Sequence, residues 1–337
     1  FFELEKSLSK NKFDQNISIL PIGTDNTILD GAHRLSISVM NNLKVKTQKF
    51  KIKDSSYNWN FFLKRGIRKQ FIEYAVKEFC IYNKNSFAAI IWPVSKDFTN
   101  DILKEFSEKN IIYLKKIKLN NFSIKNILIQ VYKDHSWLGN TENGYDGIIS
   151  KFSKIYETHG ELTLIFFTSN SFDKVSILKE KIRSIVGIGK HSIHITDNQK
   201  ETEIVADIFL NKNALEFYNS SDMFNYSNSY KLLNTFKKSI IQKGLNLNNF
   251  ILVGSLPFSL QGYIKANDLD YITNYVSIKF KEPLNSHNDY LDLYDKKRNE
   301  MIFNPEFHFI FDGIKILSND LNLNFKKNRG ELKDKIL

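Results

Sequence analysis

Strand-like and helix-like segments alternate in the middle of the chain, and this order constrains the fold more than any other feature of the sequence. ELTLIFFT (161–168) has the continuous apolar run of a buried strand, and a segment with apolar residues at helical spacing follows it and ends at Gly187. HSIHIT (191–196) alternates as a strand does, and a helix is predicted after it with Asp197 at the N-cap. Strands and helices in this order predict an α/β layer.

The rest of the chain extends this pattern, so we expect an α/β (α+β) protein of two domains. Further strands are predicted at 17–22, 27–30, 44–52, 87–94, 111–119, 126–132, 249–255 and 268–272. Further helices are predicted at 33–43, 59–82, 99–110 and 229–244. The polar stretch NSSDMFNYSNS (219–229) suggests the boundary, which gives domains 1–222 and 223–337 packed against each other.

The charge of the chain predicts attraction to anions. It has 48 Lys and Arg against 37 Asp and Glu residues, a net charge of +11. Nucleic acid, nucleotide phosphates, phosphorylated sugars and acidic polymers all fit this charge. The basic residues are scattered rather than gathered on one helix or stripe, so no specific DNA binding is expected. A composition rich in Lys, Asn, Ile and Phe explains the excess equally well.

Cysteine content and apolar run length indicate the cellular setting. Cys80 is the only cysteine and stands at helical spacing among apolar residues, so it is expected in the core, with no disulfide. No apolar run is long enough for a transmembrane segment, and a cytoplasmic location is expected. The first residues contain neither an initiator Met nor a signal peptide. We therefore expect a piece of a longer protein, in which a glycosyltransferase could be fused to it.

The segment ILDGAHRL (28–35) is the first candidate site. A Gly between a strand and a helix permits a tight turn and leaves the N–H groups of the helix N-terminus available for an anion. Arg34 could add a bidentate phosphate contact, and His33 could shuttle a proton. The alternative is an ordinary Asp30-Gly31 turn followed by a solvated His-Arg pair.

This turn and its flanks, residues 20–52, resemble the N-terminal module of the ParB/sulfiredoxin superfamily, which includes nucleotide-binding partition proteins, sulfiredoxins and free serine kinases. The resemblance implies that phosphate is held at the turn. The implied roles are nucleotide phosphate contacts for Gly31, His33 and Arg34, and orientation of the turn or of a metal for Asp30.

Two departures from that superfamily narrow the function. The second phosphate motif and the helix-turn-helix module of partition proteins are not evident downstream, which argues against DNA partitioning. Ala32 and His33 stand where sulfiredoxins have their cysteine, which argues against reduction of sulfinic acid.

The segment FILVGSLPFSLQGYIKANDLDYI (250–272) is the second candidate site. Gly254-Ser255 ends a predicted strand and could admit a phosphate, and Asp268 and Asp270 lie on one face of the next strand because side chains alternate. Two carboxylates placed in this way can hold Mg²⁺ against phosphate oxygens. The alternative is an exposed Asp-x-Asp in a turn.

The order Gly-Ser, spacer, Asp-x-Asp resembles the motif of nucleotidyltransferases, and the tail FDGIKILSNDLNLNFKKNRGELKDKIL resembles the end of small proteins with that fold. The likeness covers residues 248–337 and implies a nucleotidyltransferase-like domain, in which Asp268 and Asp270 bind the metal and Gly254 and Ser255 bind the nucleotide. Asp292 and Asp312 are candidates for a third carboxylate.

A third segment, GIGKHSIHITD (187–197), could line an anion site through Lys190, His191 and Asp197. His191 and His194 lie three apart in a strand-like stretch, so we expect them on opposite faces and unable to share a metal. The alternative is a strand with one buried and one exposed His. The preceding polar loop, 133–147, carries the aromatic residue Trp137 and could close over a substrate.

Two phosphate-handling motifs without a DNA-reading module favour an ATP- and Mg²⁺-dependent enzyme acting on a nucleotide-sugar or another small molecule. The combination resembles proteins of bacterial capsular polysaccharide gene clusters, which implies an amide ligase that activates the carboxylate of a uronic acid and joins it to an amine. In that reaction Asp30, His33, Arg34, Asp268 and Asp270 are the expected catalytic residues, with Lys190 and His191 at the nucleotide. A small-molecule or sugar kinase, a nucleotidyltransferase and a non-enzymatic nucleic-acid-binding regulator are the alternatives.

Overall fold

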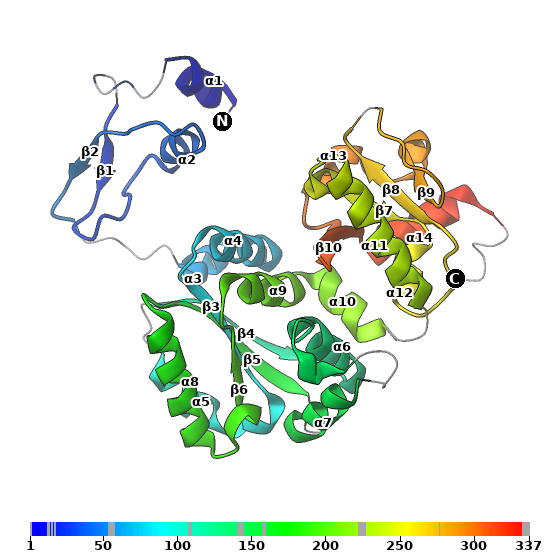
Figure 1. Ribbon diagram of the computed structural model, residues 1–337. Helices are drawn as coiled ribbons and strands as arrows, with labels where there is room; N and C mark the ends of the chain where they lie inside the picture. The colour runs from blue at the N-terminus through cyan, green and yellow to red at the C-terminus, as the bar shows by residue number, and fades with distance from the viewer. Residues whose placement is uncertain are drawn as a thin grey trace. The chain divides into compact units, whose positions relative to one another are not determined.

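The structure is a computed structural model that describes residues 2–11, 14, 16, 18–52, 58–106, 110–139, 145–156, 160–221, 227–275 and 277–331. Helices and sheets are mixed, as the sequence predicts (Figure 1). The chain forms two compact units, Phe1–Arg65 and Gly66–Leu337. The sequence suggested a boundary at 222/223 instead, between helices α10 (Lys212–Ser220) and α11 (Ser227–Gln242), which both belong to the second unit.

The first unit is a small β-α-β arrangement. Strands β1 (Leu20–Ile22) and β2 (Thr47–Lys49) pair in parallel and are connected through helix α2 (Ala32–Met40). Helix α1 (Phe2–Asn11) packs on α2, and the buried apolar residues are Leu8, Leu20 and Ile37. The strand expected at 27–30 is wrong, because Ile28 forms only an isolated bridge with Ile22.

A four-stranded antiparallel sheet begins the second unit. Its strands are β3 (Ser86–Ile91), β4 (Ile111–Lys118), β5 (Glu161–Thr168) and β6 (Ile193–Ile195). The order β4-β5-β3-β6 is that of two interleaved split β-α-β units. The short 3₁₀ helices η1 (Pro93–Phe98), η3 (Ser136–Leu138) and η4 (Gly189–His191) lie in its connections.

Helices cover both faces of this sheet (Figure 1). Alternate strand residues such as Phe87, Ile165 and Ile193 pack against helices α5 (Thr99–Glu105) and α8 (Phe172–Val186) on one face. The remaining helices around the sheet are α4 (Lys69–Tyr82), α6 (Asn121–Val131), α7 (Asp146–Ile155) and α9 (Gln199–Phe209), of which α9 packs on β3. Helix α3 (Trp59–Lys64) belongs to the first unit. Cys80 is buried in α4, as predicted.

A five-stranded mixed sheet follows, in the order β10-β11-β7-β8-β9. Its strands are β7 (Phe250–Val253), β8 (Leu269–Thr273), β9 (Leu284–Ser286), β10 (His308–Phe311) and β11 (Ile314–Leu317). β8 runs antiparallel to β7 and parallel to β9. The other elements are α12 (Leu256–Leu260), α13 (Arg298–Phe303), α14 (Asn319–Arg329), η5 (Leu247–Asn249) and η6 (Asn288–Leu293).

Three element predictions are wrong for identifiable reasons. The helix expected at 59–82 is two helices, because Gly66 adopts a left-handed conformation (φ +79°) between them. The strand expected at 126–132 is helix α6, which is buried around most of its surface, so its apolar run has no helical period. Asn198, not Asp197, caps α9 through the backbone N–H of Glu201.

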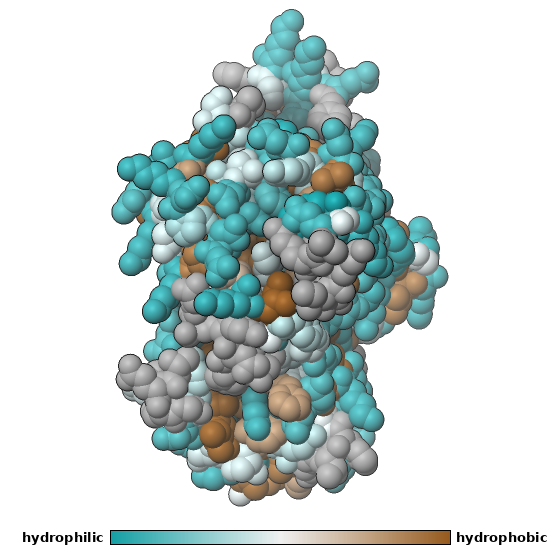
Figure 2. Space-filling model, turned by 90° about the vertical axis from the view of Figure 1, so that its right-hand side faces the viewer, coloured by the Kyte–Doolittle hydropathy of each residue, from teal (hydrophilic) through white to brown (hydrophobic). Residues whose placement is uncertain are grey.

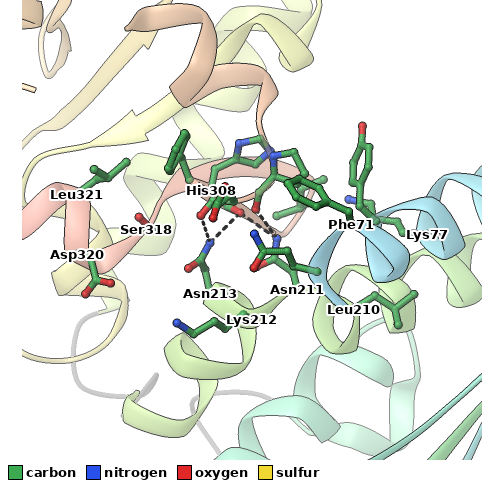
Figure 3. A pocket seen from close by; sticks show the side chains of 16 residues that line it. Phe71, Lys77, Leu210, Asn211, Lys212, Asn213, His308, Ser318, Asp320 and Leu321 are labelled. Atoms are coloured by element: carbon green, nitrogen blue, oxygen red, sulfur yellow. Dashed lines mark hydrogen bonds between the residues drawn. The ribbon is translucent and has the colours of Figure 1, made fainter. Parts of the chain in front are cut away.

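The start of α10 packs against β10 of the five-stranded sheet, beside a cavity of about 310 Å³ that α4 also lines (Figure 3). The side-chain amides of Asn211 and Asn213 donate hydrogen bonds to the carbonyl of His308, at 2.9 and 3.3 Å. His308 is itself buried, and desolvation lowers the pKa of its imidazole to about 3. Because these polar groups bond to one another across the junction, we assign this cavity a structural role.

One face of the molecule is mainly polar (Figure 2). On the face shown in Figure 2, hydrophilic residues predominate and hydrophobic residues occur in small separate groups. None of the helices in the described part of the chain is long and apolar enough to cross a membrane.

Candidate functional site

A cavity of about 600 Å³ lies at the end of β7 and β8, against α14. Both carboxylates of the Asp-x-Asp motif and the serine of the Gly-Ser turn line it. Its other lining residues are Ile264, Lys265, Asn267, Asn285, Ser286, His287, Tyr290, Phe325, Lys326, Arg329 and Glu331. The sequence prediction that Ser255, Asp268 and Asp270 meet at one place is therefore consistent with the structure.

Gly254, directly after β7, allows a close approach of its backbone to the side chain of Asp270 on β8. Gly254 has φ +73°, and a Cβ at this position would lie 2.2 Å from Oδ2 of Asp270. Asn322 of α14 holds the same peptide from both sides, since it accepts from the N–H of Gly254 at 2.9 Å and donates to its carbonyl at 2.7 Å. Only glycine combines this conformation with this contact.

Asp270 is buried and is oriented by a histidine that the sequence analysis missed. Oδ1 of Asp270 lies 3.3 Å from Nε2 of His287, and Nδ1 of His287 lies 3.1 Å from the hydroxyl of Tyr294. Burial and the nearby Asp270 raise the pKa of the Tyr294 phenol, so it stays protonated at neutral pH. His287 thus lies between Asp270 and Tyr294 and contacts both through its two ring nitrogens. This chain fixes the direction of the carboxylate.

Asp268, the cations Lys326 and Arg329, and Glu331 are further charged residues of the lining. Oδ2 of Asp268 accepts a hydrogen bond from the amide of Asn285 at 3.2 Å. Lys326 is buried next to the ring of Phe258, at 5.9 Å, and the guanidinium of Arg329 lies 5.3 Å from the ring of Phe325. The cavity therefore has the Asp-x-Asp carboxylates at the start of β8 and the cations Lys326 and Arg329 on α14, where Nε of Arg329 lies 3.4 Å from the carboxylate of Glu331. Carboxylates on one side and cations on the other are suited to a metal and a phosphate chain.

The donor set of this cavity fits Mg²⁺ bound jointly with a nucleotide. No group of three His, Cys, Asp or Glu residues suited to a metal occurs in the described part of the chain. The proposed third carboxylates, Asp292 and Asp312, do not line the cavity, and Asp312 instead pairs with Lys237 at 2.8 Å. Mg²⁺ commonly takes one or two carboxylates and completes its shell with water and substrate phosphates, which Asp268 and Asp270 can satisfy.

The Asp30–Arg34 turn has the expected backbone but different side-chain contacts. Gly31 is the N-cap of α2 with φ +89°. The guanidinium of Arg34 donates to the hydroxyl of Ser18 and lies 3.6 Å from the carboxylate of Asp30. Asp30 and His33 are exposed, and Arg34 is partly buried. A phosphate at this turn would have to compete with Ser18 and Asp30 for Arg34.

The segment 187–197 lines a separate cavity of about 390 Å³ beside the four-stranded sheet. Lys190 and His191 face this cavity rather than the one at Asp268 and Asp270. His191 belongs to η4 and His194 to β6, and both line the same cavity, so the expectation of opposite faces is wrong. The strand alternation used to predict it begins only at Ile193.

Sequence reasoning missed several residues of these cavities. His287 follows β9 without any surrounding motif, and Lys151 lies on α7 among other polar residues. Lys326 lies in the tail that resembles the end of small nucleotidyltransferase-fold proteins, but it was not singled out from the sequence. The pairing of β8 with β9, the packing of α14 and the burial of α7 bring these side chains to the cavities.

No protein-family model matches the chain, and the search of curated proteins finds no similar sequence. The function is therefore argued from the geometry of these sites.

Proposed function

We propose that this chain is an ATP- and Mg²⁺-dependent enzyme, and that the cavity at Asp268 and Asp270 binds the triphosphate and supports nucleotidyl transfer to a small acceptor. One observation carries the proposal: both carboxylates of the Asp-x-Asp motif, the serine of the Gly-Ser turn and the cations Lys265, Lys326 and Arg329 line a single cavity of about 600 Å³. An ordinary exposed Asp-x-Asp turn would not have a buried Asp270 held by His287.

The side chains of the cavity have different roles in nucleotidyl transfer. The acceptor attacks the α-phosphorus of ATP, the bond to the β-phosphate oxygen breaks, and pyrophosphate leaves. Lys326 and Arg329 offset charge on the phosphate chain, while Asp268 and Asp270 would hold the metal. Mg²⁺ bound there neutralises and orients phosphate oxygens. His287 and Tyr294 are positioning residues, because both ring nitrogens of His287 are engaged.

An ATP-dependent amide ligase is a second candidate, and the turn at Gly31 favours it. The left-handed glycine before α2 and the adjacent Arg34 form a second place where phosphate could be held. In this reaction a carboxylate attacks the γ-phosphorus of ATP and releases ADP, and an amine then displaces phosphate from the acyl phosphate. The capsular polysaccharide context of this candidate rests on the sequence resemblance.

The products separate the candidates. The chain is incubated with ATP, Mg²⁺, a UDP-uronic acid and a panel of amines, and the products are identified by phosphorus NMR and mass spectrometry. Pyrophosphate indicates nucleotidyl transfer, ADP with free phosphate indicates a ligase, and ADP with a phosphorylated acceptor indicates a kinase.

A pair of aspartate variants locates the reaction. Asp270→Asn removes a buried carboxylate of the cavity and should lower turnover by about 100-fold or more. Asp289→Asn makes the same change at an exposed carboxylate that does not line the cavity, and should leave turnover unchanged. Equal turnover in the two variants would contradict the assignment of the site.

A further inference from the structure

The cavity beside the four-stranded sheet has a marked excess of positive charge. Five Lys and Arg side chains line it, and Asp197 is the one carboxylate among its described lining residues. The basic lining residues are Lys151, Lys154, Lys179, Arg183 and Lys190, with His135, His191 and His194. Asp197 is already paired with Lys179. Arg183 pairs with Glu180 at 2.6 Å, and the excess that remains must be balanced by water or by an anionic ligand.

Lys151 of α7 is the central residue of this cavity. It is 8% exposed, and no carboxylate of the described residues pairs with it. Among the residues that the structure describes, its Nζ donates only to the carbonyl of Lys190, at 3.4 Å, and it lies 5.1 Å from the ring of Tyr132. Burying an ammonium group without a counter-ion is unfavourable, so this arrangement is suited to an incoming anion.

Unsatisfied buried polar atoms point to the same place. Nδ1 of His191, Nε2 of His194 and Nε of Arg183 are buried and have no hydrogen-bond partner within the part of the chain that the structure describes. His194 is 8% exposed and lines the cavity with Lys151. Buried polar atoms are usually bonded, and three orphans around one cavity indicate a missing polar ligand.

Two aromatic residues, Trp137 and Tyr132, line the cavity beside these cations. Trp137 lines the cavity, is 44% exposed, and contacts the buried ring of Tyr132 at 5.0 Å between centroids. An exposed indole offers a flat apolar face to a ring. The cavity thus combines a polycationic end with a stacking surface.

We infer that this cavity binds a phosphate ester carried on a ring, such as a sugar phosphate, with the phosphate beside Lys151 and the ring on Trp137. A phosphate monoester has about two negative charges. This charge matches Lys151, Lys154 and Lys190, which form no ion pair within the described residues, better than a single carboxylate does. If the proposed function holds, such a ligand would be the acceptor of the reaction or its product. The residues of the cavity at Lys151 support the binding site independently of the cavity at Asp270.

Binding is tested on the full chain with glucose 1-phosphate, inorganic phosphate and glucose as probes, by calorimetry and tryptophan fluorescence. Glucose 1-phosphate should bind more tightly than inorganic phosphate, and glucose should not bind measurably. If inorganic phosphate bound as tightly as glucose 1-phosphate, the proposed contact between the sugar ring and Trp137 would be wrong. Absence of binding by either phosphate at millimolar concentration would overturn it.

Lysine variants locate the binding. Lys151→Met should weaken glucose 1-phosphate binding at least tenfold, whereas Lys174→Met, at an exposed position of α8 outside the cavity, should not change it. Lys190→Met, at an exposed lining residue, provides the test if Lys151→Met does not fold. Wild-type affinity in the folded cavity variants would overturn the proposal.

Two further readouts separate this site from the cavity at Asp270. Binding should persist without Mg²⁺ and in Asp270→Asn, so a loss confined to that variant would place the ligand in the other cavity.

Binding should also weaken as pH rises from 7 to 9, because burial and the charges of Lys190 and Arg183 lower the pKa of Lys151 to about 8. The other groups facing Lys151 are Lys154, Lys179, His135, His191, His194 and Asp197. Binding independent of pH over this range would contradict the role of Lys151.

Discussion

At the scale of single residues, the approach of Gly254 to Asp270 is the tightest constraint on the candidate site. The missing side chain of Gly254 leaves room for the carboxylate, while Asn322 fixes the peptide and His287 fixes the other carboxylate oxygen. The position of Asp270 is thus set by neighbours on three different elements. A change at any of them should move the carboxylate without removing it.

Gly254→Ala should therefore destabilise the protein and weaken binding of Mg²⁺-ATP. The alanine Cβ would meet Oδ2 of Asp270 at 2.2 Å, in addition to the strain of a left-handed conformation, roughly 1–2 kcal/mol. Gly313→Ala is the matched control, because Gly313 has φ +78° but no atom within 4 Å of an added Cβ. Thermal unfolding and nucleotide titration of both variants measure the difference. Equal losses in the two would mean that the contact with Asp270 is unimportant.

At the scale of elements, the sequence predicted the segments that have a regular apolar pattern. It missed a helix that is buried on most sides, because such a helix has no regular pattern. β5, β7 and β8 have the expected apolar runs, and α11 has the helical spacing and final glycine that were predicted for it. α6 was taken for a strand because it is buried among other helices and has no polar face. Its N-cap, Asn120, was the available signal for a helix.

The candidate sites show the same limit. Gly254, Ser255, Asp268 and Asp270 could be predicted together because one strand-turn-strand segment carries them. His287 and Lys326 could not, since they come from separate elements that only the sheet order and the packing of α14 bring to the cavity. Short motifs indicate the part of a site built by one segment, and tertiary structure supplies the rest.

A buried ion pair joins α4 to β4. Oε1 of Glu73 lies 2.7 Å from Nζ of Lys115 and accepts a hydrogen bond from the hydroxyl of Tyr113 at 2.9 Å. Both charged side chains are almost fully buried, and desolvation lowers the pKa of Lys115 in spite of the carboxylate. Removing one partner of such a pair leaves a buried charge uncompensated.

Glu73→Leu should accordingly lower the free energy of unfolding by about 3–5 kcal/mol, and the double variant Glu73→Leu/Lys115→Met should recover part of that loss. The control is Glu216→Gln, which breaks an exposed pair with Lys212 and should change stability by less than about 0.5 kcal/mol. Chemical denaturation of the four proteins gives the comparison. If the double variant were less stable than Glu73→Leu, the lysine would contribute through its bond to the carbonyl of Phe209 rather than through the ion pair.

At the scale of the whole molecule, the division into two units separates the candidate sites. The turn at Asp30–Arg34 belongs to the first unit, whereas the cavities at Asp270 and Lys151 belong wholly to the second. The first unit has a small apolar core built on Leu8, Leu20 and Ile37, and a core of that size stabilises a chain only marginally. The second unit has two sheets with their own cores.

Residues 66–337 produced alone should therefore unfold cooperatively near the temperature of the full chain and bind Mg²⁺-ATP with unchanged affinity. The reason is that every residue lining the cavity at Asp270 remains in this fragment, together with β9 and α14, which orient them. Calorimetry of the fragment and of the full chain, each with and without Asp270→Asn, measures both quantities. A fragment that folds but has lost ATP binding would instead place the nucleotide at Gly31 and Arg34, and Arg34→Ala in the full chain would then abolish binding as well.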